Sequence, residues 1–252
     1  MRIRPLLAAL LVTALALGTA GAGAVEQPSS EASAAASPPF GDESSPLRPG
    51  ASLGGYCTFN WVFADVVDPV TEPERVPDAY IGTAGHCTDE AGERVQLGDG
   101  PEIGTVVYDS DEAGSEVDFS LIRIDAEMVG STNPTMLGWG GPTGSVTTDD
   151  LAMGDQVDVH GYGILLGDLE PTRSRFGFLV NWTDDEYVAD MPAVNGDSGS
   201  PLLHDETGKA LGIISRYGFA ATPPSTDTGP MMPWIFRELQ AAGFDVALAT
   251  AQ

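Results

Sequence analysis

Hydrophobic residues in this chain recur in short runs that are separated by turn-forming residues. From residue 56 onward, apolar or alternating stretches are punctuated by Gly, Pro, Asp and Asn. Short runs bounded in this way favour antiparallel β-structure over βαβ units. The runs cover residues 57–63, 80–84, 103–108, 118–124, 156–159, 177–182, 201–204 and 210–215.

A helical pattern occurs near the C-terminal end of the chain. Pro233 stands near a first turn, and apolar residues between positions 234 and 239 recur at helical spacing. Gly243 stands where a C-terminal cap is expected. These signals predict one short C-terminal helix on an otherwise all-β chain.

The first 24 residues have the three parts of a secretory signal peptide. Arg2 and Arg4 supply a positive start, residues 5–17 form an apolar run, and Ala22-Gly23-Ala24 resembles a cleavage site. The alternative is an N-terminal membrane anchor, but the run is shorter than the roughly 20 residues that span a bilayer. We therefore expect an exported protein that is secreted and has no membrane anchor after signal cleavage.

Composition divides the remaining chain into two parts. Residues 25–53 are rich in Ser, Ala, Pro and Gly and contain few apolar residues. Such a segment cannot bury enough surface to order itself, so we expect a linker or a short propeptide. The folded domain is predicted over residues 54–252.

The charge balance excludes one large class of partner. The chain has 37 acidic and 11 basic residues and a net charge of −26. A nucleic-acid binder needs a basic surface to replace counterions on phosphate, so no nucleic-acid partner is expected.

Two cysteines cannot form a four-thiolate zinc site. We expect no metal, no cofactor and a monomer.

Ser198 is the first candidate for chemistry. It lies in the sequence Asn195-Gly196-Asp197-Ser198-Gly199-Ser200-Pro201. Neighbouring glycines allow a tight turn in which successive N–H groups converge, as an oxyanion site requires. An ordinary loop turn is the alternative interpretation of this segment alone.

His86 is the candidate base for such a serine. A Ser hydroxyl is a weak nucleophile until a base takes its proton, and His titrates near neutrality. His160 and His204 lie within or beside apolar runs, where a structural role is the better interpretation. His86 instead follows an apolar run directly and precedes Cys87, one of only two cysteines.

The two cysteines, Cys57 and Cys87, are expected to pair because the chain is exported. Two reduced, buried thiols are the alternative.

A third candidate is Asp118, which precedes an apolar run and can be buried only if it finds partners. A His N–H is a suitable partner, although many Asp residues at strand starts are turn caps.

The three candidate segments follow one another in the order of a known family. Residues 83–87, 118–122 and 196–201, supported by 161–163 and 212–215, resemble the chymotrypsin-like serine peptidases over about residues 55–245. The compact spacing is closer to bacterial secreted members such as the streptogrisins than to animal trypsins. The resemblance implies two packed six-stranded antiparallel β-barrels with the active site between them.

The resemblance also implies a role for each matching residue. His86 would be the general base, Asp118 its orienting partner and Ser198 the nucleophile. The N–H groups of Gly196 and Ser198 would form the oxyanion hole. The substrate-binding residues would be Pro192, Ser215, Arg216 and Tyr217, with residues 215–217 pairing with an extended peptide.

The chain departs from the family in the partner of Asp197. No Ile-Val-Gly-Gly-like start occurs, so no new N-terminus can be assumed to pair with this carboxylate. A buried Asp197 then needs another cation, and an Arg is expected. Arg173, Arg175 and Arg216 are the candidates.

Specificity is predicted from three positions. Pro192 stands where trypsins carry an acid at the pocket floor, so cleavage after Lys or Arg is not expected. Ile214 stands where glutamyl-specific relatives carry a His, and Tyr217 replaces a residue that is usually small. These positions predict small or medium apolar side chains before the scissile bond.

Other interpretations of the chain stay open. The acidic stretch at 109–116 could bind calcium, but it lacks the EF-hand spacing and a solvated acidic turn is favoured. The predicted function is a secreted serine endopeptidase that acts on proteins or peptides. The alternatives are a chymotrypsin-fold binding protein without turnover and a secreted esterase that uses the same triad.

Overall fold

The computed structural model describes residues 37–68, 70–163, 173–218 and 226–251. The signal-peptide prediction for residues 1–24 lies outside the described residues. No helix within those ranges is long and apolar enough to cross a membrane.

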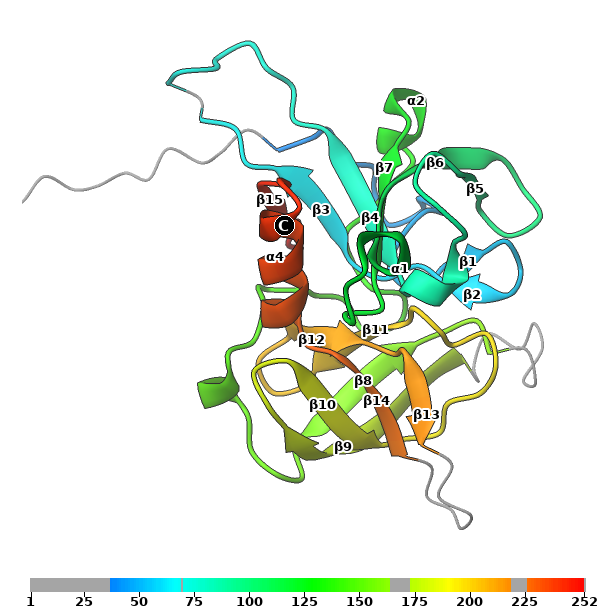
Figure 1. The fold of residues 1–252 in the computed structure, drawn as a ribbon, viewed down its shortest axis with the longest axis vertical. Helices are drawn as coiled ribbons and strands as arrows, with labels where there is room; N and C mark the ends of the chain where they lie inside the picture. Colours follow the sequence, from blue (N-terminus) through cyan, green and yellow to red (C-terminus); the bar gives the residue numbers. More distant parts are fainter. Residues whose placement is uncertain (1–36, 69, 164–172, 219–225, 252) are drawn as a thin grey trace, which may run out of the picture. The chain divides into compact units, whose positions relative to one another are not determined.

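The first sheet is entirely antiparallel and has the strand order β15-β3-β4-β7-β6-β5 (Figure 1). Its strands are β3 (Val62–Asp65), β4 (Ala79–Thr83), β5 (Arg94–Gln96), β6 (Glu102–Asp109), β7 (Ser120–Ile124) and β15 (Val246–Leu248). A separate hairpin of β1 (Ser52–Leu53) and β2 (Cys57–Thr58) meets this sheet through a bridge between Leu53 and Leu97. Short helical turns connect the strands: η1 (Gly85–Cys87), α1 (Ser110–Ala113) and α2 (Ala126–Val129).

The second sheet is also antiparallel, with the order β12-β11-β8-β9-β10-β14-β13. The helical turn η2 (Thr148–Asp150) precedes its strands, which are β8 (Gln156–His160), β9 (Ser174–Trp182), β10 (Glu186–Asp190), β11 (Pro201–His204), β12 (Lys209–Ile213), β13 (Arg216–Gly218) and β14 (Thr226–Pro230). The two edge strands, β12 and β13, are separated along the chain only by Ile214 and Ser215. One broken segment therefore supplies both edges, and a bridge between Gly212 and Met231 joins β12 to the end of β14. The sheet closes as a barrel of six chain segments.

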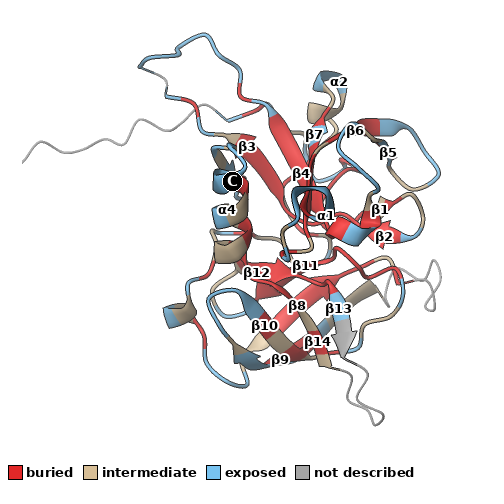
Figure 2. Cartoon of the chain, viewed as in Figure 1, coloured by how far each residue is buried: buried red, intermediate tan, exposed pale blue. Residues whose placement is uncertain are grey.

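Each barrel encloses its own buried core (Figure 2). The first core contains Trp61, Phe63 and Phe119, and the second contains Tyr187 and Leu211. Trp61 Nε1 donates a hydrogen bond of 3.0 Å to Gly212 O, which links the two barrels. The all-β, two-barrel architecture expected from the resemblance is confirmed.

The predicted C-terminal helix is also confirmed. It is α4 (Met232–Ala241), and its apolar face buries Ile235 and Leu239 in the first core. Gly243 follows the last turn with φ +92°, a conformation that glycine adopts readily. The chain then adds β15 to the first sheet beside β3, an element that the sequence pattern did not predict.

Part of the low-complexity segment packs against the first barrel. Leu47 is fully buried, and its backbone pairs with the 131–133 segment through hydrogen bonds of 3.3 Å and 2.9 Å. Arg48 is buried as well and donates to the carbonyls of Thr135 and Glu43. Residues 37–53 thus contribute to the fold despite their composition, while a processing boundary near residue 53 stays a prediction.

Candidate active site

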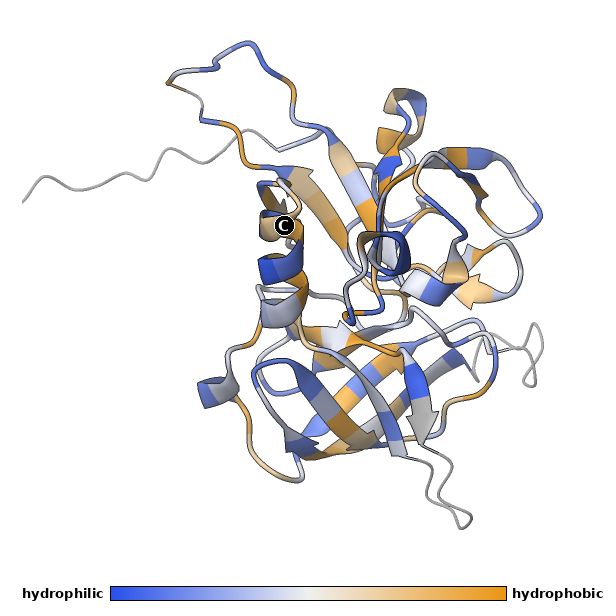
Figure 3. Ribbon diagram, viewed as in Figure 1, coloured by the Kyte–Doolittle hydropathy of each residue, from blue (hydrophilic) through white to orange (hydrophobic). Residues whose placement is uncertain are grey.

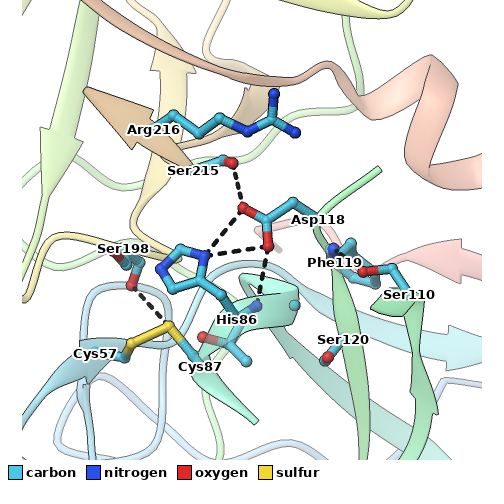
Figure 4. Close-up of polar contacts among 12 residues, drawn as sticks. Cys57, His86, Cys87, Ser110, Asp118, Phe119, Ser120, Ser198, Ser215 and Arg216 are labelled. Atoms are coloured by element: carbon cyan, nitrogen blue, oxygen red, sulfur yellow. Dashed lines mark hydrogen bonds and ion pairs between the residues drawn. A yellow bond between two sulfur atoms is a disulfide. The ribbon is translucent and has the colours of Figure 1, made fainter. Parts of the chain in front are cut away.

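His86 and Asp118 come together because β4 and β7 are neighbouring strands. Thr83, at the end of β4, pairs with Ser120, at the start of β7. The turn η1 after β4 presents His86, and Asp118 lies two residues before β7. His86 Nδ1 lies 3.0 Å and 3.1 Å from the two carboxylate oxygens of Asp118, and the His86 backbone N–H donates to Oδ1 at 2.9 Å (Figure 4).

The Asp118 carboxylate has a third donor in the hydroxyl of Ser215, which binds Oδ2. Burial alone would raise the pKa of Asp118, but the hydrogen bonds from His86 and Ser215 outweigh it and lower this pKa. The carboxylate is therefore kept ionised beside the imidazole. This role of the Ser215 hydroxyl was not predicted, because the sequence assigned Ser215 only a backbone contact with substrate.

The imidazole of His86 has a raised pKa. Its hydrogen bond to Asp118 raises the pKa of His86; the Asp118 and Asp111 charges act in the same direction, while burial and Arg216 oppose them. The His86 side chain remains 45% exposed although Asp118 holds its Nδ1. A ring nitrogen held by a carboxylate leaves the other nitrogen free to act as a base.

Ser198 lies in a loop that hydrogen bonds attach to β2 and to the residue after β12. Its carbonyl accepts a 2.9 Å hydrogen bond from Thr58 N on β2, and Thr58 Oγ1 donates to Gly196 O at 2.7 Å. Gly199 N donates to Ile214 O at 2.7 Å. Thr58 is fully buried, and no sequence signal pointed to its role.

Two backbone donors in this loop are unoccupied. The Asp197 N–H donates to Val194 O at 3.0 Å. In the part of the chain that is described, the N–H groups of Gly196 and Ser198 on either side of it donate no hydrogen bond. Two free backbone donors next to a serine hydroxyl are the kind of arrangement that can stabilise an oxyanion.

The disulfide between Cys57 and Cys87 brings the serine and histidine segments together. The pairing prediction is confirmed, with a Cα–Cα distance of 6.2 Å. The Cys87 Sγ lies 3.8 Å from Ser198 O and within 4.8 Å of a His86 ring nitrogen. Figure 4 shows the His86 ring between Asp118 and Ser198, although no hydrogen bond joins His86 to Ser198.

Asp197 is paired with Arg175. Their bidentate contact has N–O distances of 2.8 Å and 2.6 Å, and Arg175 also donates to Pro192 O at 3.1 Å. Of the three arginines considered from the sequence, Arg175 is therefore the partner. Arg173 instead lies over the Tyr162 ring, and Arg216 is exposed, 4.0 Å from Glu186.

The acidic stretch at 109–116 contains the short helix α1, with Asp109 at its N-cap. Asp109 is buried and caps α1 by accepting from Glu112 N at 3.0 Å. Its other oxygen accepts from Thr88 at 2.7 Å and from Ser120 at 2.9 Å. Three hydrogen bonds therefore hold the Asp109 carboxylate at the start of α1.

A cleft of about 780 Å³ adjoins His86 and Asp118. Four further carboxylates line it, and Arg216 is the one arginine in its wall. The residues that carry these carboxylates are Asp111, Glu116, Asp185 and Glu186. Figure 3 shows α1, which supplies Asp111, as hydrophilic. The cleft thus has a strongly negative lining.

Comparison with known proteins identifies the architecture. No protein-family model matches the chain, and no curated protein matches it. Among solved structures, Thermobifida fusca protease A is 21% identical with a TM-score of 0.55, and the alignment covers 81% of this chain and 99% of that one.

Two further structures are similar over the same share of this chain. A glutamic-acid-specific serine protease is 18% identical with a TM-score of 0.56, over 81% of this chain and all of its own length, 100%. Cellulomonas bogoriensis chymotrypsin is 19% identical with a TM-score of 0.52, over 81% of this chain and 99% of its own. The chain therefore has the fold of the bacterial chymotrypsin-like serine proteases.

Proposed function

We propose that this protein is a secreted serine endopeptidase in which Ser198 is the nucleophile, His86 the general base and Asp118 its orienting partner. The observation that carries the proposal is the hydrogen bond between His86 Nδ1 and an ionised Asp118, beside Ser198, whose loop offers the free backbone N–H groups of Gly196 and Ser198. A binding protein without turnover has no need for this combination.

The proposed reaction has two steps. Ser198 Oγ attacks the peptide carbonyl carbon while His86 Nε2 takes the hydroxyl proton, and the N–H groups of Gly196 and Ser198 receive the oxyanion. The C–N bond then breaks as His86 returns the proton to the leaving amine, which leaves an acyl-enzyme ester. Water attacks this ester with His86 again as base, releases the acid and restores Ser198.

Under this proposal, the Arg175–Asp197 pair allows the loop that carries Ser198 to form without an activating cleavage. In the proposal, the internal guanidinium supplies the positive charge that holds Asp197 and therefore the two oxyanion donors. The disulfide and the predicted signal peptide support export, since disulfides persist in oxidising compartments.

The test is labelling of the secreted chain with a fluorophosphonate, with a diverse peptide library assayed in parallel. Ser198→Ala should abolish labelling and lower turnover by about 10⁶-fold. Ser200→Ala is the matched control, because Ser200 is a buried serine of the same loop whose hydroxyl has no hydrogen-bond partner. It should retain labelling.

Each result separates the candidate functions. Ser198-dependent labelling with peptide cleavage supports the endopeptidase. Labelling with hydrolysis of esters but of no peptide would point to the esterase. A folded wild-type chain that is not labelled would overturn the catalytic assignment and favour the binding protein.

A further inference from the structure

Asp227 is a buried carboxylate without a partner. It lies on β14 and is fully buried, and neither of its oxygens has a hydrogen-bond partner among the described residues. The buried carboxylates of Asp109, Asp158 and Asp197 each accept at least one hydrogen bond. Burying a carboxylate without a hydrogen-bond partner lowers the stability of the folded protein. Such a group therefore suggests a ligand that binds it.

The position of Asp227 connects it to the proposed catalytic centre. The next residue, Thr228, accepts a 3.1 Å hydrogen bond from Ser215 N, and the Ser215 hydroxyl binds Asp118. Asp227 shares a face of β14 with Gly229, and a Cβ at Gly229 would meet Ile213 O. The Asp227 side chain therefore lies on the face of β14 that is directed toward Ile214 and Ser215, the two residues between β12 and β13.

The register places Asp227 opposite Tyr217 of β13 on one side and Ala189 of β10 on the other. β10 leads directly into the 191–198 segment that carries the nucleophile. Asp227 therefore sits between the two segments that the sequence assigned to substrate binding, the one around Pro192 and the one at 215–217.

Among the described residues, no cationic side chain forms an ion pair with Asp227. Arg175 is near enough to act on Asp227, but both of its guanidinium nitrogens that reach a carboxylate bind Asp197. Burial and the neighbouring charges of Asp197 and Asp190 raise the pKa of Asp227 to about 7. Above that pH, a cation that reached Asp227 would find a carboxylate with no other hydrogen-bond partner among the described residues.

We infer that Asp227 is the acidic anchor of the substrate side-chain pocket and binds the positive group of a Lys or Arg immediately before the scissile bond. The inference rests on the proposed function. It replaces our expectation of an apolar preference, which considered the acid missing at Pro192 and not an acid supplied by another strand.

The surrounding charge fits a cationic peptide. An extended substrate that pairs with the edge strand β13 runs along the cleft lined by Asp111, Glu116, Asp185 and Glu186. These groups attract positive peptides in general. Asp227 differs from them because it is buried beside the nucleophile segment and therefore selects one side chain.

The test compares matched peptides that differ at one residue. Arg and citrulline have nearly the same shape and differ in charge, and Leu represents an apolar side chain. We expect kcat/KM at pH 8.5 to be at least about tenfold higher for the Arg peptide than for the citrulline peptide, the scale of a hydrogen bond to a charged group. The ratio should fall about tenfold toward pH 6 as Asp227 takes up a proton. His86 titrates with both substrates and cancels in the ratio.

Asp227→Asn, which is nearly isosteric, should bring the Arg-to-citrulline ratio close to one at every pH. Asp149→Asn is the matched control, because it removes the same charge from an exposed position on η2 and should keep the ratio. If Asp227→Asn does not fold, the pH dependence of the wild-type ratio still tests the inference.

Two results would overturn the inference while leaving the proposed function intact. They are equal cleavage of the Arg, citrulline and Leu peptides by the wild type, and an unchanged Arg preference in Asp227→Asn. Failure to cleave any peptide together with no labelling of Ser198 is a separate result, because it rejects the proposed function itself.

Discussion

The Arg175 guanidinium binds the Asp197 carboxylate through two hydrogen bonds, and the exposed fractions of the two side chains are 9% and 0%. Arg175 comes from β9 and Asp197 from the loop that carries Ser198, so the pair fixes this loop to the wall of the second barrel. The same Asp197 also accepts from Val194 N at 2.8 Å, which closes the turn below the nucleophile.

Arg175→Ala should destabilise the protein and reduce its activity together. Removing one partner of a buried ion pair leaves an uncompensated charge, which costs about 3–5 kcal/mol of unfolding free energy. Denaturant unfolding and kcat/KM check the two effects. A double variant, Arg175→Ala with Asp197→Asn, should recover part of the stability because no charge is then left unpaired. Arg175→Ala with normal stability and activity would contradict the role of this pair.

The acid side of the activity profile should report His86. Because Asp118 raises the pKa of His86, kcat/KM for a neutral peptide should fall with a midpoint above the ordinary value of about 6.5. Arg216 opposes this shift and Asp111 supports it. Arg216→Gln should therefore move the midpoint to higher pH and Asp111→Asn to lower pH. Shifts of the same sign in both variants would contradict this electrostatic account.

Gly199→Ala should displace the nucleophile loop. Gly199 has φ +88°, and a Cβ there would meet Thr58 O, lie 2.5 Å from Thr83 Oγ1 and lie 3.0 Å from Ala84 N. Gly92 is the matched control, with φ +98° and no atom within 4 Å of its Cβ position. In both variants, placing an alanine at a positive φ should lower the free energy of unfolding by about 1–2 kcal/mol. Gly199→Ala should add a packing cost of about 1–3 kcal/mol and lose activity. Equal unfolding free energies in the two variants would refute the packing argument.

The buried Asp227 carboxylate should make the free energy of unfolding depend on pH. The pKa of Asp227 is about 7 in the folded chain, whereas an unfolded Asp titrates near 3.9. Between about pH 4 and pH 7 the folded state keeps a proton that the unfolded state releases, so this group lowers stability as the pH rises. Asp227→Asn should therefore stabilise the protein by about 2–3 kcal/mol more at pH 8 than at pH 5. Denaturant unfolding at both pH values checks this, and an equal effect at the two would contradict the raised pKa.

The sequence alone was enough to predict the strands and the helix that carry a clear pattern of apolar residues. Apolar runs predicted β3, β4, β6, β7, β8, β9, β11 and β12, and helical spacing predicted α4, because each places apolar side chains in one of the two cores. The short strands β5, β14 and β15 were not predicted. β14 reads Thr226-Asp227-Thr228-Gly229-Pro230, and its strand conformation depends on pairing with β10 and β13 rather than on its own residues.

The candidate residues of the site divide in the same way. His86, Asp118 and Ser198 could be proposed as candidates because their three segments follow one another in the order of a known family, and the Cys57–Cys87 pair because the chain has only two cysteines. The Ser215 hydroxyl, the buried Thr58, the choice of Arg175 and the position of Asp227 could not. Ser215, Thr58 and Arg175 each contact a residue distant in sequence, and the place of Asp227 depends on the strands beside it. Tertiary structure therefore decides which of these buried polar groups meet.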